Sequence, residues 1–122
     1  MLQNTLFTFT AIVVKDDIIK TDIGLNPSHP IFDGHFPGQP LLPGVCMLQI
    51  VKEVLEAYLQ KTIRLIRGDD LKFLAMITPE PGKLIQVVLK IEPTDQLINV
   101  TGGLFDGANQ LFKFKGLFMA IA

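Results

Sequence analysis

GHFPGQPLLPGV, residues 34–45, is the most informative segment of this 122-residue chain. It overlaps a longer stretch, residues 26–44, that contains five prolines and three glycines. Proline removes a backbone donor and fixes φ, so neither a helix nor a central strand persists at that density. Residues 45–60 then contain neither proline nor glycine. This pattern predicts a long packed loop that leads directly into a helix, with Pro43-Gly44 at the helix start.

Strands are predicted on both sides of this loop and helix, because β-branched and apolar residues alternate or form short runs there. The predicted strands are residues 5–14, 18–25, 62–67, 71–77, 84–91, 97–104 and 111–121. Residues rich in proline, glycine and aspartate separate the later strands as turns. The order of two strands, one helix and about five strands predicts a single α+β domain over residues 1–122. One helix would pack on a mostly antiparallel sheet.

The predicted helix changes character along its length. Its first two turns are apolar on nearly every side, so they are expected to be buried, and Cys46 among them is read as a buried structural cysteine. Farther along, polar residues recur at helical spacing and form one stripe: Gln49, Lys52, Glu53, Glu56 and Gln60.

Composition and charge exclude several functional classes. The formal net charge is −1 and the eleven Lys and Arg are scattered, so the basic stripe that nucleic acid requires is missing. Two histidines without a third plausible ligand do not predict a metal site. One cysteine excludes an intramolecular disulfide, and no apolar run approaches the roughly 20 residues that cross a bilayer. With no secretory signal pattern at the start, we expect a cytoplasmic protein that binds neither nucleic acid nor membrane.

Residues 34–45 resemble the signature of the β-hydroxyacyl-acyl carrier protein dehydratases, in which a GHFPG loop runs into a PGV that opens the central helix of a hot-dog fold. Weaker similarities occur at Lys72-Phe73, at Pro81-Gly82 and in FKFKG at residues 112–116. The resemblance covers most of the chain from about Ile12 onward, although the family's usual opening His-Arg-x-Pro-Phe is missing. It implies a hot-dog fold, an antiparallel sheet wrapped around one central helix.

The resemblance also implies an activity, partners and an assembly. The activity is dehydration of 3-hydroxyacyl thioesters in fatty-acid or related lipid synthesis. The partner is acyl carrier protein, which carries the acyl chain on 4′-phosphopantetheine. The family builds its site at a homodimer interface, where the histidine of one subunit faces the acidic helix position of the other. No nucleotide or metal cofactor is implied.

Chemical roles follow for residues of the signature. His35 suits the base that removes the α-proton, because imidazole titrates near neutrality. Backbone N–H groups at the helix start, around Gly44 and Val45, suit the thioester oxygen, since unpaired N–H groups and the helix dipole both favour negative charge there. Glycines such as Gly38 and Gly44 let the backbone approach a substrate closely.

Position 49 departs from the family pattern. The family carries Glu or Asp fourteen positions after its histidine, and here that position is Gln49. An amide donates and accepts hydrogen bonds but cannot deliver a proton as an acid. A general acid accelerates such a reaction roughly 10²–10⁴-fold. Either His35 shuttles the proton while Gln49 holds the hydroxyl or a water, or the chemistry has changed. Glu53, one turn farther on the same face, is an alternative acid or a solvated helix charge.

Two other functions remain open because a fold does not fix a function. The first is an acyl thioesterase, which needs a carboxylate to activate water, and the helix offers only Glu53 and Glu56. The second is a catalytically silent hot-dog subunit that binds acyl carrier protein or a partner subunit after losing its acid.

Overall fold

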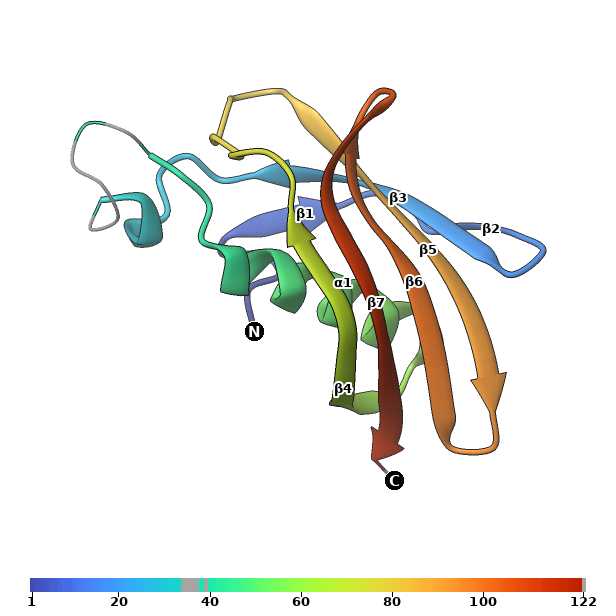
Figure 1. Ribbon diagram of the computed structural model, residues 1–122. Helices are drawn as coiled ribbons and strands as arrows, with labels where there is room; N and C mark the ends of the chain where they lie inside the picture. The colour runs from blue at the N-terminus through green and yellow to red at the C-terminus, as the bar shows by residue number, and fades with distance from the viewer. Residues whose placement is uncertain (34–37, 39, 122) are drawn as a thin grey trace.

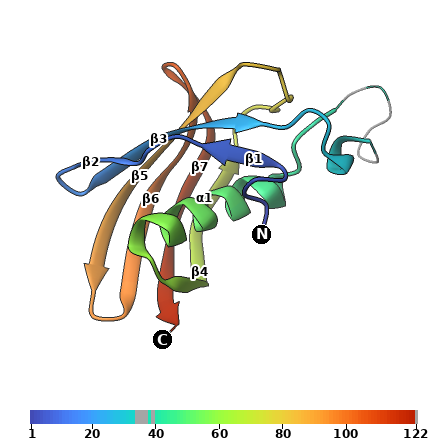
Figure 2. The ribbon, with the colours of Figure 1, turned by 180° about the vertical axis from the view of Figure 1, so that it is seen from behind.

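The computed structural model describes residues 1–33, 38 and 40–121. Its main feature is a strongly curved sheet of seven strands, whose concave face holds one long helix (Figures 1 and 2). All pairings between the named strands are antiparallel. The α+β class and the antiparallel sheet around one helix are therefore confirmed.

The elements follow the predicted order with some changes. The strands are β1 (Phe7–Phe9), β2 (Val13–Lys15), β3 (Ile18–Leu25), β4 (Thr62–Phe73), β5 (Leu84–Thr94), β6 (Leu97–Asp106) and β7 (Asn109–Ile121). The helices are α1 (Gly44–Leu59) and a single 3-10 turn, η1 (Pro30–Phe32), within the proline-rich loop. The sheet order is β1-β3-β5-β6-β7-β4, and β2 pairs with β3 beyond β1. One edge of the sheet is therefore β4, and β1 and β2 share the other.

The prediction of one strand over residues 5–14 is wrong, because β1 and β2 are separate strands that both pair with β3. The interruption falls after Thr10, whose backbone N–H still donates to the Asp22 carbonyl at 3.0 Å. Phe9 pairs with Ile23 and Val13 with Lys20, so three residues on one side of the interruption lie opposite two on the other. This extra residue, as in a β-bulge, interrupts the ladder.

The predicted strands 62–67 and 71–77 are instead one strand, β4, which pairs with β7. Two irregularities, between Leu65 and Arg67 and between Gly68 and Asp70, absorb the extra residues without ending the pairing. The chain leaves the sheet after Phe73, so residues 74–77 are not a strand.

The helix α1 fills the hollow of the sheet. Ile50, Val51, Val54 and Leu55 are fully buried in one cluster with apolar residues from the surrounding strands. Cys46 is buried, as predicted. Val45 departs from the expectation of a helix start buried on all sides, because its side chain is 74% exposed.

The curvature that creates this hollow depends on glycine in β6. Gly102 and Gly103 have φ of 155° and 156°, and a Cβ there would lie 2.0 Å from the Val88 carbonyl oxygen and 1.8 Å from that of Phe112. No side chain fits between the backbones at these distances, so the two glycines let β5, β6 and β7 bend together around α1.

Among the described residues, no helix is long and apolar enough to cross a membrane.

Candidate functional site

An open apolar pocket of about 280 Å³ lies at the start of α1. The loop before the helix, the first helical turn and the end of β4 contribute its lining residues: Leu41, Leu42, Pro43, Gly44, Met47, Phe73, Ala75 and Met76. Phe73 and Met76 are 55% and 79% exposed, so part of the apolar lining faces solvent. Such a pocket suits an apolar chain that enters from outside.

Gly44 and Phe73 meet at this pocket. A Cβ on Gly44 would lie 2.7 Å from two atoms of the Phe73 ring, so the ring packs directly against the helix backbone. The ring of Phe73 is stacked on that of Phe112, with centroids 5.2 Å apart and an interplanar angle of 17°. The stacking holds the aromatic wall against the first turn of α1.

Among the described residues, no group accepts a hydrogen bond from the backbone N–H of Gly44 or Val45 at the helix start. The first bonds of the helix run from the N–H groups of Cys46 and Met47 to the Pro43 carbonyl, at 3.0 and 3.4 Å. The N–H groups of Gly44 and Val45 precede these bonds, and Pro43 offers no side-chain cap. No acidic residue occupies the first turn. The positive end of the helix dipole is therefore not offset by a carboxylate of this turn.

Gln49 lies farther along α1 and lines a different, open groove of about 520 Å³. The groove residues come from the N-terminal segment, from α1 and from the connection into β4: Met1, Gln3, Gln49, Lys52, Glu53, Glu56, Ala57, Gln60, Lys61 and Thr62. The half-buried Gln49 donates a hydrogen bond from Nε2 to Glu53 Oε2 at 2.8 Å.

Glu53 is fully buried, and its carboxylate binds the N-terminal segment. The Leu2 N–H contacts both carboxylate oxygens, at 2.9 and 2.8 Å, and the Gln3 N–H donates to Oε1 at 2.8 Å. The prediction of a solvated helix charge at Glu53 is wrong, because residues about fifty positions earlier in the chain cover this face of α1. Backbone groups make the contact, so no side-chain pattern in the sequence signals it.

Glu56, the other helix carboxylate, has a different role. Its Oε2 accepts from the backbone N–H of Ile63 at 2.9 Å, which ties the end of α1 to the start of β4. His29 serves the loop, because its Nδ1 accepts from the Ile31 N–H at 3.0 Å.

The predicted site residues are thus distributed over several places. His35 lies outside the described residues. Gly38 is exposed, with a positive φ of 82° that glycine tolerates. Gly44 lines the apolar pocket, whereas the Val45 side chain does not. Gln49 is five residues beyond Gly44, so the two residues lie about 140° apart around the helix axis. One chain therefore does not bring Gly44 and Gln49 into the same cavity.

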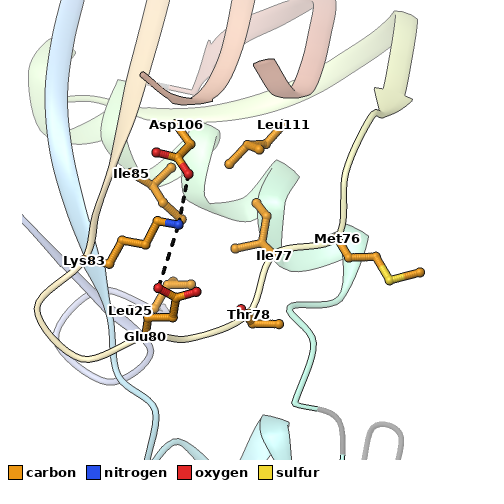
Figure 3. Close-up of a pocket in the computed structure, with 9 residues that line it drawn as sticks. All are labelled: Leu25, Met76, Ile77, Thr78, Glu80, Lys83, Ile85, Asp106 and Leu111. Atoms are coloured by element: carbon orange, nitrogen blue, oxygen red, sulfur yellow. Dashed lines mark ion pairs between the residues drawn. The ribbon is translucent and has the colours of Figure 1, made fainter. Parts of the chain in front are cut away.

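A third, smaller cavity of about 150 Å³ lies beside the chain that links β4 to β5 (Figure 3). Lys83 is at its edge, 2.9 Å from Asp106 and 3.8 Å from Glu80. The hydrogen bond and charge of Asp106, followed by the charge of Glu80, raise the pKa of Lys83. Since two carboxylates already neutralise Lys83, a phosphate or carboxylate ligand would have to displace them. The pocket at the start of α1 is the stronger candidate.

Within the described ranges, no group of three or more His, Cys, Asp or Glu side chains is arranged to hold a metal ion.

Comparison with known proteins identifies similar sequences. The family model ApeI-like, described as ApeI dehydratase, matches residues 11–104. A 3-hydroxyacyl-[acyl-carrier-protein] dehydratase FabZ of Haemophilus influenzae is 36% identical over 59 residues, or 48% of this chain and 39% of the relative. FabZ of Coxiella burnetii is 28% identical over 105 residues, or 85% of this chain and 70% of the relative. The match therefore spans less than half the length of the first of these relatives.

Solved structures share the fold. The dehydratase heterocomplex ApeI:P from Xenorhabdus doucetiae aligns with a TM-score of 0.69 at 21% identity, covering 89% of this chain and 95% of that one. An uncharacterized protein from Erwinia carotovora aligns with a TM-score of 0.60 at 25% identity, covering 93% and 92%. The virulence protein Cj0977 from Campylobacter jejuni aligns with a TM-score of 0.68 at 14% identity, covering 98% and 88%. The sheet and helix described above are the hot-dog fold.

Proposed function

The chain belongs to the ApeI-like dehydratase family, and on that premise we propose that it removes water from 3-hydroxyacyl thioesters carried by acyl carrier protein. The observation that carries the proposal is the junction at Gly44. There the family signature leads into a helix start with available N–H groups, beside an open apolar pocket. A thioester carbonyl needs such donors and an acyl chain needs such a pocket, so both parts of the substrate find a matching surface.

The reaction assigns a role to each site residue. His35 takes a proton from C2, and the electrons of the C–H bond form an enolate whose negative oxygen accepts from the N–H groups of Gly44 and Val45. The electron pair then returns from the enolate oxygen, the double bond between C2 and C3 forms, and the C3–O bond breaks. The departing hydroxide takes the proton from His35 and leaves as water. Gln49 holds the 3-hydroxyl in place before it departs.

This arrangement requires two copies of the chain. Within one chain Gly44 and Gln49 line different cavities, so a substrate bound at one does not meet the other. We infer that the Gly44 pocket and His35 of one subunit combine with Gln49 of a second subunit in a homodimer. The family resemblance, in which the histidine and the helix position face each other across two subunits, supports the same assembly.

The test uses the purified chain and a 3-hydroxyacyl thioester of acyl carrier protein. Formation of the conjugated enoyl thioester is followed by its absorbance, with a saturated acyl thioester as a parallel substrate. His35→Ala is expected to reduce enoyl formation by at least roughly 10²-fold while the far-ultraviolet circular dichroism is unchanged. Wild-type turnover in His35→Ala would refute the proposed mechanism.

The thioesterase alternative is weakened by what the two helix carboxylates bind. Glu53 is fully buried and accepts backbone N–H groups, and Glu56 accepts from Ile63. Neither carboxylate is free to activate water. Release of free thiol from the saturated acyl thioester would restore this alternative.

The amide at position 49 favours the second alternative, a silent subunit that acts with a different hot-dog partner. A chain without a general acid lacks the roughly 10²–10⁴ in rate that such an acid contributes. The related complex from Xenorhabdus doucetiae is described as a heterocomplex. If the chain alone forms neither enoyl product nor free thiol but binds acyl carrier protein, the silent subunit is the better assignment.

A further inference from the structure

We propose that Glu53 is a positioning residue that orients the side-chain amide of Gln49, so that Gln49 presents its carbonyl oxygen to the 3-hydroxyl group of the substrate. The inference rests on the proposed dehydratase function and adds a specificity to it. The site would favour a substrate group that donates a hydrogen bond at C3 over one that only accepts.

The first step concerns the carboxylate. Glu53 is fully buried, and all its hydrogen bonds use it as an acceptor, from the N–H groups of Leu2 and Gln3 and from Gln49 Nε2. The two backbone donors belong to the N-terminal segment, which lies outside α1. Glu53 is therefore anchored independently of Gln49.

The second step concerns the amide. An amide facing a carboxylate must turn its NH₂ group toward it, because two facing oxygens would repel each other. Glu53 Oε2 is 2.8 Å from Gln49 Nε2, as this rule requires. The carbonyl oxygen of the planar amide then points away from Glu53. Among the described residues, none donates a hydrogen bond to Gln49 Oε1, although Gln49 lines an open groove.

The third step concerns the ligand. A carbonyl oxygen accepts the O–H of a 3-hydroxyl group but has nothing to offer a 3-oxo group, which is also an acceptor. The chosen orientation therefore recognises the hydroxyl form of the substrate. It also explains the amide at position 49, since a glutamate there would place a second carboxylate against the buried Glu53.

Binding is measured by calorimetry with 3-hydroxyacyl and 3-oxoacyl pantetheine amides, in which NH replaces the thioester sulfur and C2 is too weakly acidic to react. The wild-type chain is expected to bind the 3-hydroxyacyl amide roughly tenfold more tightly than the 3-oxoacyl amide, because one oriented hydrogen bond contributes about that much to affinity. In Glu53→Gln the new amide can donate to Gln49 Oε1 and turn the Gln49 amide over. The preference is then expected to fall severalfold or to reverse.

Glu56→Gln is the matched control. It removes the same charge from the same helix and also weakens a bond to a backbone N–H, but Glu56 binds Ile63 and not Gln49. Its preference for the hydroxyl form should equal that of wild type. A merely structural role of Glu53 would make the two variants alike in preference, and this result would overturn the proposal.

Exchange of the two side chains tests the pair directly. Gln49→Glu alone should lower the thermal midpoint by at least about 4 °C, because two carboxylates then face each other. The double variant Gln49→Glu with Glu53→Gln restores one donor and one acceptor, so it should recover most of that loss. Strictly additive changes of the midpoint in the two single variants and the double variant would overturn the proposal. A wild-type chain that prefers the hydroxyl form but makes no enoyl product would leave the proposal standing and refute the dehydratase function.

Discussion

The residue that sets the shape of the candidate site is Gly44, because a side chain there would meet the Phe73 ring at 2.7 Å. Gly44→Ala is expected to push the half-exposed ring outward into the apolar pocket at the start of α1. We predict a loss of about 1 kcal/mol in the free energy of unfolding, at the low end of overpacking, since the ring can partly swing aside. The rate of enoyl formation should fall by more than the small loss of folded protein explains, because the displaced ring occupies the space of the substrate.

Phe73→Leu provides the partner for a double-mutant cycle on this contact. Adding it to Gly44→Ala should recover most of the lost stability, with a coupling free energy of about 1 kcal/mol between the two positions. Urea unfolding of the four proteins measures that coupling. A coupling near zero would mean that Phe73 does not pack on the helix start.

Cys46, in the same helical turn, gives a pH-dependent prediction. Burial raises the pKa of the Cys46 thiol in the folded chain. The folded state therefore favours the protonated thiol. The resulting stability is fully present below about pH 9 and is lost as the pH rises through the folded pKa. Wild type should lose more stability than Cys46→Ala between pH 7 and about pH 10.

Urea midpoints of the two proteins at both pH values isolate the thiol, because every other side chain is the same in both. Equal pH dependence in wild type and Cys46→Ala would contradict the burial of this group. Alkylation of Cys46 in the native protein at pH 8 should likewise be much slower than in urea, since the thiolate is the reactive form.

At this scale the sequence predicts the types of the site residues better than their contacts. The family signature identifies Gly44 and Gln49, and the structure places Gly44 at an apolar pocket on a helix start. The environment of Glu53 could not be predicted, because it depends on backbone N–H groups of Leu2 and Gln3, which any residue type supplies. A buried carboxylate and a solvated one look alike in a helical stripe until the covering segment is known.

At the scale of elements, β6 depends on its glycine pair. Gly103→Ala would place a methyl group 1.8 Å from the Phe112 carbonyl oxygen in the neighbouring strand. Neither backbone can yield without breaking the ladder between β6 and β7. We predict a loss of more than about 3 kcal/mol, beyond ordinary overpacking, or failure to fold.

Gly107→Ala, in the turn between β6 and β7, is the matched control. It also has a positive φ, 58°, but nothing lies within 4 Å of the added Cβ. Only the backbone penalty of roughly 1–2 kcal/mol applies there. Thermal unfolding compares the two variants, and similar midpoints would show that backbone conformation rather than packing makes Gly103 necessary.

The order of elements was predictable where hydrophobic periodicity is long and turns carry proline or glycine. The helix and the last three strands follow this rule. The errors fall where pairing with a neighbouring strand overrides the local pattern: one extra residue between Phe9 and Val13 divides the first strand, and bulges near Gly68 keep β4 continuous. Residues 74–77 have strand composition, yet Leu74 and Ala75 both donate to the Leu111 carbonyl and leave the sheet.

For the whole molecule, the edge strand β4 is the surface that the proposed homodimer would use. Among the described residues, β7 is the one strand that pairs with it, and Ile66, Leu71 and Phe73 along it are 44%, 36% and 55% exposed. A long edge strand with exposed apolar residues invites pairing with another strand. Along β4, Arg64 and Arg67 precede Asp69 and Asp70. If two β4 strands pair antiparallel about a two-fold axis, the arginines of each strand lie opposite the aspartates of the other.

Ile66→Lys tests this assembly, because it places a charge on the exposed edge while costing a single chain little. We predict that the variant remains folded. Its dimer dissociation constant should rise at least roughly tenfold, which is a loss of about 1.4 kcal/mol in the free energy of association. Val13→Lys is the control: Val13 is 63% exposed on β2, at the opposite edge of the sheet, and should leave assembly unchanged. Sedimentation at micromolar concentration and enoyl formation are measured on the same samples.

Because Gly44 and Gln49 line different cavities, activity should disappear together with the dimer. A wild-type chain that sediments as a folded monomer and still forms enoyl product would refute both the interface and the two-chain site.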